Sequence, residues 1–340
     1  MKQYEIEMEQ VRFTEEGKEN MRKRIKENTN NSKKSFPMGK YMGVAACLCI
    51  LVGTAYATGI LQPVSEIFAP IFGGSVAQTE IIDQIGRPLN ASDTDKGITI
   101  TAEAIIGDKN NVCVVFKVAQ KDGTPLELPD SMTHEDLVLS GTGVMFSQLG
   151  GTHGNSRFDL GEDGHYRMIQ TLSSDDDMPF GTNVTASFEE LGFWGDDNKI
   201  HTLSDGKWKM KFELNYEDTS VNIDVGESFL REDVTFTVDS IRISPVGLLV
   251  NYTFDTTPTL SSESGQTTEQ QREEYALFKE LDIIVTLQDG TEVDFSSGGG
   301  GSVQDGYTQA HKSGTFDEII PLEDIFSVTV GDVVVILEQR

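Results

Sequence analysis

Histidines and carboxylates are the side chains in this sequence that could carry out acid–base or metal-dependent chemistry. The 340 residues include five histidines, and none has the HExxH spacing that places two zinc ligands and a base on one helix face. His153 and His165 share a glycine-rich stretch with Asp159, Glu162 and Asp163, although loops between strands commonly carry such histidines. The other three are His134, His201 and His311. The GxSxG and GxxxxGKS/T motifs are also absent. The sequence therefore predicts no enzyme, no cofactor and no metal site.

Runs of acidic residues offer the oxygen ligands that a hard cation such as calcium prefers. Two such runs are Asp175–Asp177 and Asp196–Asn198. A third, Asp93–Gly97, begins like an EF-hand loop but lacks the spaced later ligands and the distant glutamate of that motif. The competing interpretation is that all three are solvated turns that keep the surface soluble, and we adopt it.

The charge of the chain is strongly acidic and unevenly distributed. The formal net charge is −28, from 27 basic and 55 acidic side chains. Residues 1–40 hold ten basic and seven acidic residues, whereas the remaining 300 hold 17 and 48, a net charge of −31. Because phosphate binding needs a positive surface, this balance argues against direct nucleic-acid binding.

The boundary between these two charge regions is a long uncharged segment. Residues 41–65 carry no charge, and the most apolar part runs from Met42 to Leu61. About 20 helical residues span roughly 30 Å, the thickness of the hydrocarbon core of a bilayer. We therefore predict a transmembrane helix over residues 41–62, with the basic N-terminus in the cytoplasm and the rest of the chain outside. The alternatives are a signal peptide cleaved after Ala57 and, less compatible with the composition, a buried core helix.

The basic segment 1–40 is too short to form its own core. Thr14, followed by two glutamates, is a plausible helix start. Phe13, Met21 and Ile25 form a thin apolar stripe on that helix, and they are the candidate partner-docking residues. Two interpretations remain open: the helix rests on anionic lipid headgroups, or it folds onto a cytoplasmic partner.

The region outside the membrane has the alternation of β-strands. Residues 97–118 predict a strand hairpin whose turn is Asp108–Asn111. A similar pattern recurs without gaps later in the chain, over 233–254, with its turn at Pro245–Gly247. Identical residues are few, but the phase of alternation and the turn position agree. We therefore predict a duplicated hairpin.

Further strands and Gly/Asp/Asn turns predict a mainly β fold: a transmembrane helix followed by two immunoglobulin-like antiparallel β-sandwich domains, 63–218 and 219–340. Cys113 is the one cysteine beyond the apolar segment, and we expect it to be a packing residue. We place the domain boundary at Asp218–Gly226, a polar insertion at Thr256–Arg272 with a following helix at Glu273–Leu281, and a flexible loop tip at Gly298–Gly301. The remaining predicted strands are Leu137–Phe146, His165–Leu172, Asn183–Phe188, Trp208–Tyr216, Leu281–Leu287, Glu292–Phe295, Gly314–Ile319 and Ser327–Leu337.

The apolar segment, the hairpin of residues 97–118 and the late segment Phe316–Leu322 together resemble the DUF4179 family of single-pass membrane proteins from Gram-positive bacteria. The resemblance covers residues 40 to about 120 best. It implies a short cytoplasmic tail, one transmembrane helix and an external immunoglobulin-like region. Many members are encoded beside extracytoplasmic-function sigma factors and are regarded as their membrane-bound negative regulators. The family implies no catalytic or ligand-binding residue, and this tail lacks the His-Cys-Cys zinc motif of the better-known anti-sigma domains.

We expect a membrane-anchored regulator in the cell membrane. In this hypothesis, an external sensor with an unknown ligand is coupled to a sigma factor that binds residues 1–40, and residues 41–62 cross the lipid bilayer. The alternative is an envelope-binding or adhesion module in which residues 1–62 serve only as an anchor.

Overall fold

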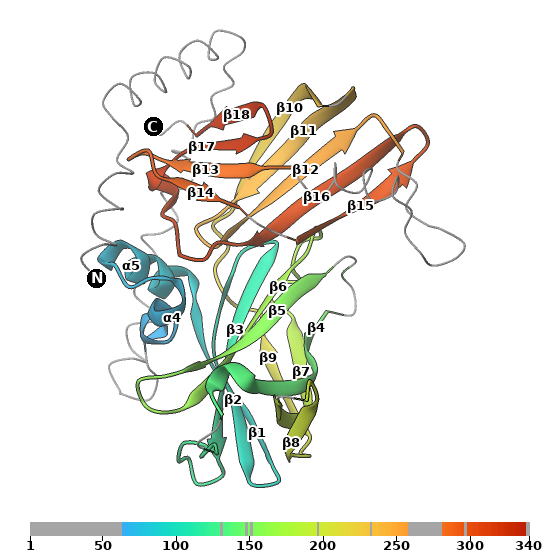
Figure 1. Ribbon diagram of the computed structural model, residues 1–340. Helices are drawn as coiled ribbons and strands as arrows, with labels where there is room; N and C mark the ends of the chain where they lie inside the picture. The colour runs from blue at the N-terminus through green and yellow to red at the C-terminus, as the bar shows by residue number, and fades with distance from the viewer. Residues whose placement is uncertain are drawn as a thin grey trace, which may run out of the picture. The chain divides into compact units, whose positions relative to one another are not determined.

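The computed structural model describes most of the chain beyond the predicted membrane segment (Figure 1). The predicted tail, with Phe13, Met21 and Ile25, and the predicted span 41–62 lie outside the described residues, as does most of the predicted polar insertion. Of the helices that are described, none has the length and apolar character needed to cross a membrane. The described residues are 63–129, 132–146, 149, 152–195, 197–231, 233–257, 281–295 and 298–337.

The fold is mainly β, as the alternation of apolar residues predicts. The described strands form four sheets with antiparallel pairing throughout. Two of the sheets come from residues before 214 and two from residues after 220. Each pair of sheets packs around buried apolar residues, so the architecture consists of two sandwiches of two sheets each. The immunoglobulin-like topology stays a prediction.

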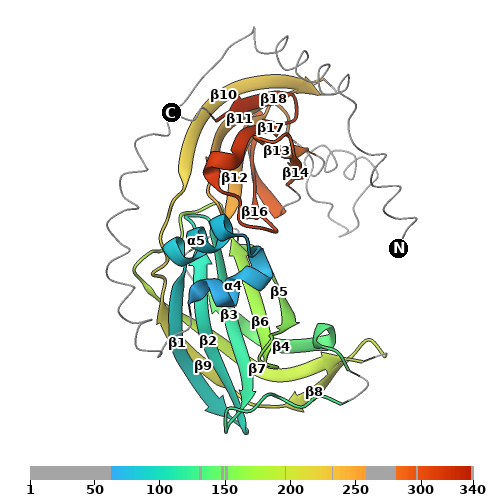
Figure 2. The same cartoon turned by 90° about the vertical axis from the view of Figure 1, so that its left-hand side faces the viewer.

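Two short helices precede the sheets, where the sequence analysis predicted none. They are α4 (Val64–Phe72) and α5 (Val76–Ile85). Ser75 and Gln78 form a reciprocal capping box at the start of α5. Figure 2 shows both helices lying against the first sheet, and their buried residues form an apolar cluster with that sheet.

The first sandwich consists of a five-stranded sheet, in the order β1-β2-β3-β6-β5, and a second sheet in which β7 pairs with β4 on one side and with β8 and β9 on the other. Its core contains Phe116, whose ring packs edge-on against that of Phe188 at 5.1 Å, and Trp208, which is 1% exposed. The strands are β1 Arg87–Asp95, β2 Ile98–Gly107, β3 Asn111–Gln120, β4 Leu137–Met145, β5 His153–Leu160, β6 Tyr166–Ser173, β7 Asn183–Trp194, β8 Ile200–Ser204 and β9 Trp208–Glu213, with a 3-10 turn, η3, at His134–Asp136.

The second sandwich has a five-stranded sheet in the order β10-β11-β12-β16-β15 and a four-stranded sheet in the order β14-β13-β17-β18. The rings of Phe236 and Phe254 stack in its core, and the partly buried ring of Phe229 stacks on Phe236. The strands are β10 Val221–Arg231, β11 Val234–Ile243, β12 Gly247–Phe254, β13 Ile283–Leu287, β14 Glu292–Asp294, β15 Gly298–Gln304, β16 Tyr307–Thr315, β17 Ile325–Val330 and β18 Val333–Ile336, with a 3-10 turn, η4, at Leu322–Asp324.

The predicted duplicated hairpin is confirmed, and the repeat is larger than the sequence indicated. The five-stranded sheets have the same strand order, and the offset in residue number that relates the two hairpins also relates β1 to β10. Two register irregularities follow the same offset. The one between Pro88 and Ala91 recurs between Asp224 and Glu227, and the one between Ala102 and Ala104 recurs between Val238 and Ser240. Because a β-bulge is a specific local feature of a strand, this agreement indicates a common origin for the two sheets.

Several local predictions were wrong. Gly298–Gly301 is the start of edge strand β15 and not a loop tip. The glycine-rich stretch that carries His153 forms edge strand β5. The predicted strand Gly314–Ile319 lies mostly beyond the end of β16, and Ser327–Leu337 contains parts of two strands joined by a turn at Gly331. In each case a long-range pairing partner decides the conformation, which local composition does not reveal.

The turns that join the first two strands of each repeat give a test of the duplication. Gly97 has φ +82° and the equivalent Asp233 has φ +66°, a region in which a side chain costs energy. We expect Asp233→Gly to raise the free energy of unfolding by about 0.5 kcal/mol, and Gly97→Asp to lower it by about 0.5–1 kcal/mol. Urea denaturation measures both changes. A lower urea midpoint for Asp233→Gly would contradict the equivalence of the two turns.

Candidate functional site

The two sandwiches meet at the turns of the duplicated hairpins. In the first turn, Asp108 Oδ1 accepts hydrogen bonds from the backbone N–H groups of Asn110 and Asn111, both at 2.7 Å. In the second, the hydroxyl oxygen of Ser244 accepts from the N–H groups of Val246 and Gly247, at 3.0 and 3.1 Å. Asp108 and Ser244 occupy the same position in the two repeats, so two equivalent turns use the same capping geometry.

The capping side chains of these two turns also bond to each other. Ser244 Oγ donates to Asp108 Oδ2 at 2.5 Å, and Asn111 Nδ2 donates to both oxygens of the carboxyl at 3.0–3.1 Å. Asp108 is only 3% exposed. Burial raises the pKa of the Asp108 carboxyl, while the four donor groups oppose that rise. Tyr216 adds a hydrogen bond from its hydroxyl to the Asp108 carbonyl at 3.0 Å. We call Asp108, Asn110, Asn111, Tyr216 and Ser244 the joint.

A polar loop from the first sandwich extends the joint. Arg242 Nη1 donates to Asn110 Oδ1 at 2.9 Å and to Asp177 Oδ1 at 2.6 Å. Asn110 Nδ2 donates to the carbonyl of Ser174 at 3.0 Å. The acidic run Asp175–Asp177, which could have bound calcium, therefore contacts the second sandwich. Among the described side chains, no group of three His, Cys, Asp or Glu residues is placed to hold a metal ion.

Two histidines lie beside this loop. His153 Nε2 is 2.9 Å from the Ser313 carbonyl oxygen, and His311 Nδ1 is 3.5 Å from Asp175 Oδ2. Burial lowers the pKa of His311, and His153 lowers it further, while Asp175 opposes both effects. The glycines of β15 fit this packing, because a Cβ on Gly298 would overlap the His153 ring.

The helices α4 and α5 contact both sandwiches close to the joint. Phe68 and Phe72 belong to an apolar cluster that also contains Cys113 of β3 and Ile319 of the second sandwich. Cys113 is thus a buried packing residue, and burial raises the pKa of its thiol to about 12. The N–H of Ile319 donates to the Phe72 carbonyl at 2.8 Å. Gln78 Nε2 donates to the Ile319 carbonyl at 3.1 Å and to a Glu318 carboxylate oxygen at 3.2 Å.

The structure does not assemble the other sequence candidates into one site. His165 contacts Asp163, whereas His153 contacts the Ser313 carbonyl of the second sandwich. Asp163 also pairs with Arg167 at 2.7 Å, which lowers the pKa of the carboxyl. Arg167 in turn bonds to Glu103, which pairs with Lys117, so these residues form an ion-pair network on the first sheet. His201 bonds to Asp197, and Asp93 accepts from the Lys209 N–H. Asp196 lies outside the described residues.

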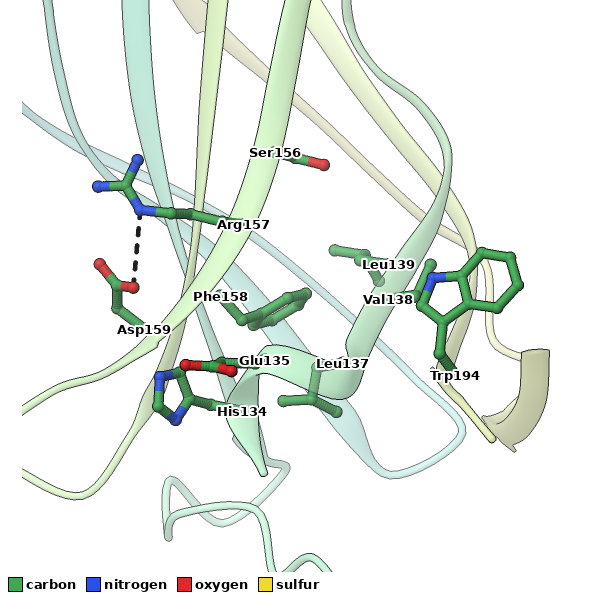
Figure 3. Close-up of a pocket in the computed structure, with 10 residues that line it drawn as sticks. All are labelled: His134, Glu135, Leu137, Val138, Leu139, Ser156, Arg157, Phe158, Asp159 and Trp194. Carbon is green, nitrogen blue, oxygen red and sulfur yellow. Dashed lines mark ion pairs between the residues drawn. The ribbon is translucent and has the colours of Figure 1, made fainter. Parts of the chain in front are cut away.

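A groove of about 500 Å³ is present on the first sandwich (Figure 3). It lies between β4 and β5, and η3 and the end of β7 complete its wall. Figure 3 shows Phe158 pointing toward Leu137 and Leu139, whereas Arg157 and Asp159 point away and pair with each other at 3.7 Å. Trp194 is 52% exposed at one side of the groove. The sequence analysis named His134 only as one of five histidines. It did not reveal the groove, because the walls of the groove come from four separate elements.

The joint leads to a stability prediction. Ser244→Ala removes the donor to Asp108 and leaves the N–H groups of Val246 and Gly247 without their acceptor. We expect it to lower the free energy of unfolding by about 2–4 kcal/mol, because the affected groups are buried. Ser228→Ala is the matched control: its hydroxyl bonds to Thr237 on an exposed surface, so about 0.5 kcal/mol or less is expected. Equal losses in urea denaturation would contradict the structural role of the joint.

The pH dependence of the joint follows from the raised pKa of Asp108. The folded state binds this proton more tightly than the unfolded state. The group's contribution to stability is therefore complete below the ordinary pKa of 3.8 and is lost as pH rises through the folded-state pKa. Asp108→Asn does not titrate, so we expect its stability deficit relative to wild type to shrink as pH rises from 3.5. Parallel stability curves for the two proteins would contradict this expectation.

Comparison with known proteins identifies a family for part of the chain. Residues 33–120 match the profile of DUF4179, a domain of unknown function. No curated protein matches the chain. Among solved structures, the chain is similar to "The crystal structure of the conserved domain protein from Bacillus anthracis", with 18% sequence identity, a TM-score of 0.47, and coverage of 72% of this chain and 75% of that one. The match to the family profile spans the whole predicted membrane segment 41–62, α4, α5 and strands β1–β3. The family that the comparisons support for this chain is therefore DUF4179, by a match confined to residues 33–120.

Proposed function

We propose that this protein is a single-pass membrane regulator that resembles an anti-sigma factor. In this proposal residues 41–62 cross the cell membrane and the two sandwiches lie outside the cell. Residues 1–40 bind a sigma factor in the cytoplasm, and Phe13, Met21 and Ile25 form the docking stripe. A change in the external region is passed to the tail through α4 and α5.

The observation that carries the proposal is the position of α4 and α5. They follow directly after the predicted membrane segment, and Phe72 and Gln78 make hydrogen bonds to the second sandwich. The same helices share an apolar cluster with β2 and β3 of the first sandwich. A rearrangement of the sandwiches at the joint would therefore displace the residues next to the membrane. A simple anchor has no need of such contacts.

The charge distribution supports the proposed orientation, and the family resemblance supports the proposed class of partner. The net charge of +3 in residues 1–40 and of −31 beyond them favours a cytoplasmic N-terminus. The DUF4179 family implies a sigma factor as the partner, because many members are encoded beside one. The alternative is an adhesion or envelope-binding module with no signalling role, for which residues 2–30 would be dispensable.

The tail is tested by co-purification. We expect a sigma factor to co-purify from cells with the full-length chain and to be lost on Met21→Asp, because a charge in the apolar stripe opposes docking. Asn20→Asp adds the same charge at the neighbouring position, off the stripe, and should retain the partner. If no sigma factor is recovered with the wild-type chain, or if both variants retain it equally, the docking role is wrong.

The proposed coupling through α4 and α5 is tested by a substitution at Gln78. Gln78→Glu keeps an oxygen for the capping box but replaces the donor to the Ile319 carbonyl and places a negative charge beside Glu318. We expect at least a twofold change in the transcription of a sigma-dependent reporter, without loss of the protein from the membrane. Gln84→Glu, on the same helix, is the matched control and should leave the reporter unchanged. The same reporter output for the two variants would refute coupling through α5.

A further inference from the structure

The two repeats differ at one edge: β13 of the second sandwich has a strand paired on each side, whereas its equivalent in the first sandwich, β4, has a described strand on one side only. Strand β13 lies between β12 and β15 in the chain and pairs with β17, the strand after β16. Strand β4 occupies the same place in the first sandwich, between β3 and β5, and pairs with β7. On its other side β13 pairs with β14, whereas no described strand pairs with β4 there.

The groove of Figure 3 lies along this open side of β4. At the far end of the strand the edge is covered, because the N–H of Val144 donates to Gln170 Oε1 at 3.0 Å. A Cβ on Gly143 would overlap the Gln170 side chain, which confirms the close approach. The first half of β4, from Leu137 to Leu139, lines the groove. The Leu137 N–H is bonded to the His134 carbonyl, so an added strand would pair with the backbone of β4 beyond that N–H.

The groove has different surroundings on the two faces of β4. On the inner face, Phe158 and Leu139 are buried and apolar. On the outer face, Val138 pairs with Gly192, which has no side chain, so the exposed ring of Trp194 is accessible nearby. A strand added here would place alternate side chains against these two apolar surfaces.

The edge of a sheet selects a polypeptide, because only a polypeptide presents alternating N–H and C=O groups at the matching repeat. The charge around the groove indicates which kind of polypeptide would bind. Glu135 is exposed at the groove, Asp159 is already paired with Arg157, and the chain beyond residue 40 has a net charge of −31. A second copy of this chain would be repelled, and a basic segment attracted.

We propose that the free edge of β4 binds an extended, basic polypeptide segment of another protein by strand addition. The site does not depend on the proposed regulatory role, since binding is measured without a sigma factor or a reporter. If the reporter experiment refutes coupling through α5, the peptide site on β4 is unaffected. If the peptides do not bind, the proposed coupling through α5 is unaffected.

Synthetic peptides test the site on the full-length chain in uncharged detergent. The probe is an eight-residue peptide of alternating valine and lysine, capped at both ends, and its counterpart alternates valine and glutamate. The chain has two tryptophans; Trp208 is buried, so a change in emission reports on Trp194. We expect the lysine peptide to shift this emission to shorter wavelength with a dissociation constant below 100 μM, and the glutamate peptide to have no effect.

Two further probes separate strand addition from general attraction of charge. Versions of the lysine peptide that are N-methylated on alternate amides, in the two possible registers, have the same charge. We expect the version whose methyl groups face β4 to lose binding and the other to retain it. Glu135→Lys should weaken binding at least fivefold. Glu80→Lys, which changes another exposed glutamate on α5, should not.

Several outcomes would overturn the proposal: no binding of the lysine peptide at 1 mM, equal binding of both methylated versions, or equal effects of Glu135→Lys and Glu80→Lys. A shift of Trp194 emission by chitohexaose, without a shift by the peptides, would assign the groove to carbohydrate. Self-association that is weakened by Glu135→Lys, seen by analytical ultracentrifugation, would assign it to a second copy.

Discussion

The hydrogen bond from Ser244 to Asp108 joins the two halves of this structure at the one place where their equivalent turns meet. Both residues cap their own turn with the same geometry, so neither could be replaced without disturbing the hairpin to which it belongs. Burial of the carboxyl would be costly without donors, and its own turn and Ser244 supply them. The contact between the sandwiches therefore depends on the internal order of each hairpin.

Other contacts between the two sandwiches are arranged around this bond. Arg242 reaches from β11 to Asn110 and Asp177, and the His311 ring lies beside Asp175. The helices α4 and α5 join the same region through the Phe72 carbonyl and the Gln78 side chain. These described hydrogen bonds and ion pairs lie beside the apolar cluster that contains Phe72, Cys113 and Ile319, so polar and apolar contacts together join the two sandwiches. The proposed coupling through α4 and α5 depends on these contacts.

The hairpins could be predicted from the sequence because both strands and the turn are local. Alternation defined the strands around Asp108–Asn111, and the recurrence of the same pattern later in the chain located β11 and β12. The edge strands β5 and β15 could not be found in this way. Glycine composition indicates a loop, and only pairing with β6 and β16 holds them as strands. The helices α4 and α5 were missed because α4 carries an internal proline and both are short.

The sequence by itself determined the mainly β fold, the repeat, and the polarity of charge about an uncharged segment of membrane-spanning length. These are properties of periodicity and composition, which act over neighbouring residues. Tertiary structure alone decided which residues form a site. Asp108 and Ser244 are ordinary turn residues until the sandwiches bring them together. Val138, Phe158 and Trp194 line one groove only because β4 pairs with β7 and packs beside β5 of the other sheet. Such sites arise from the packing of distant segments, which no local pattern encodes.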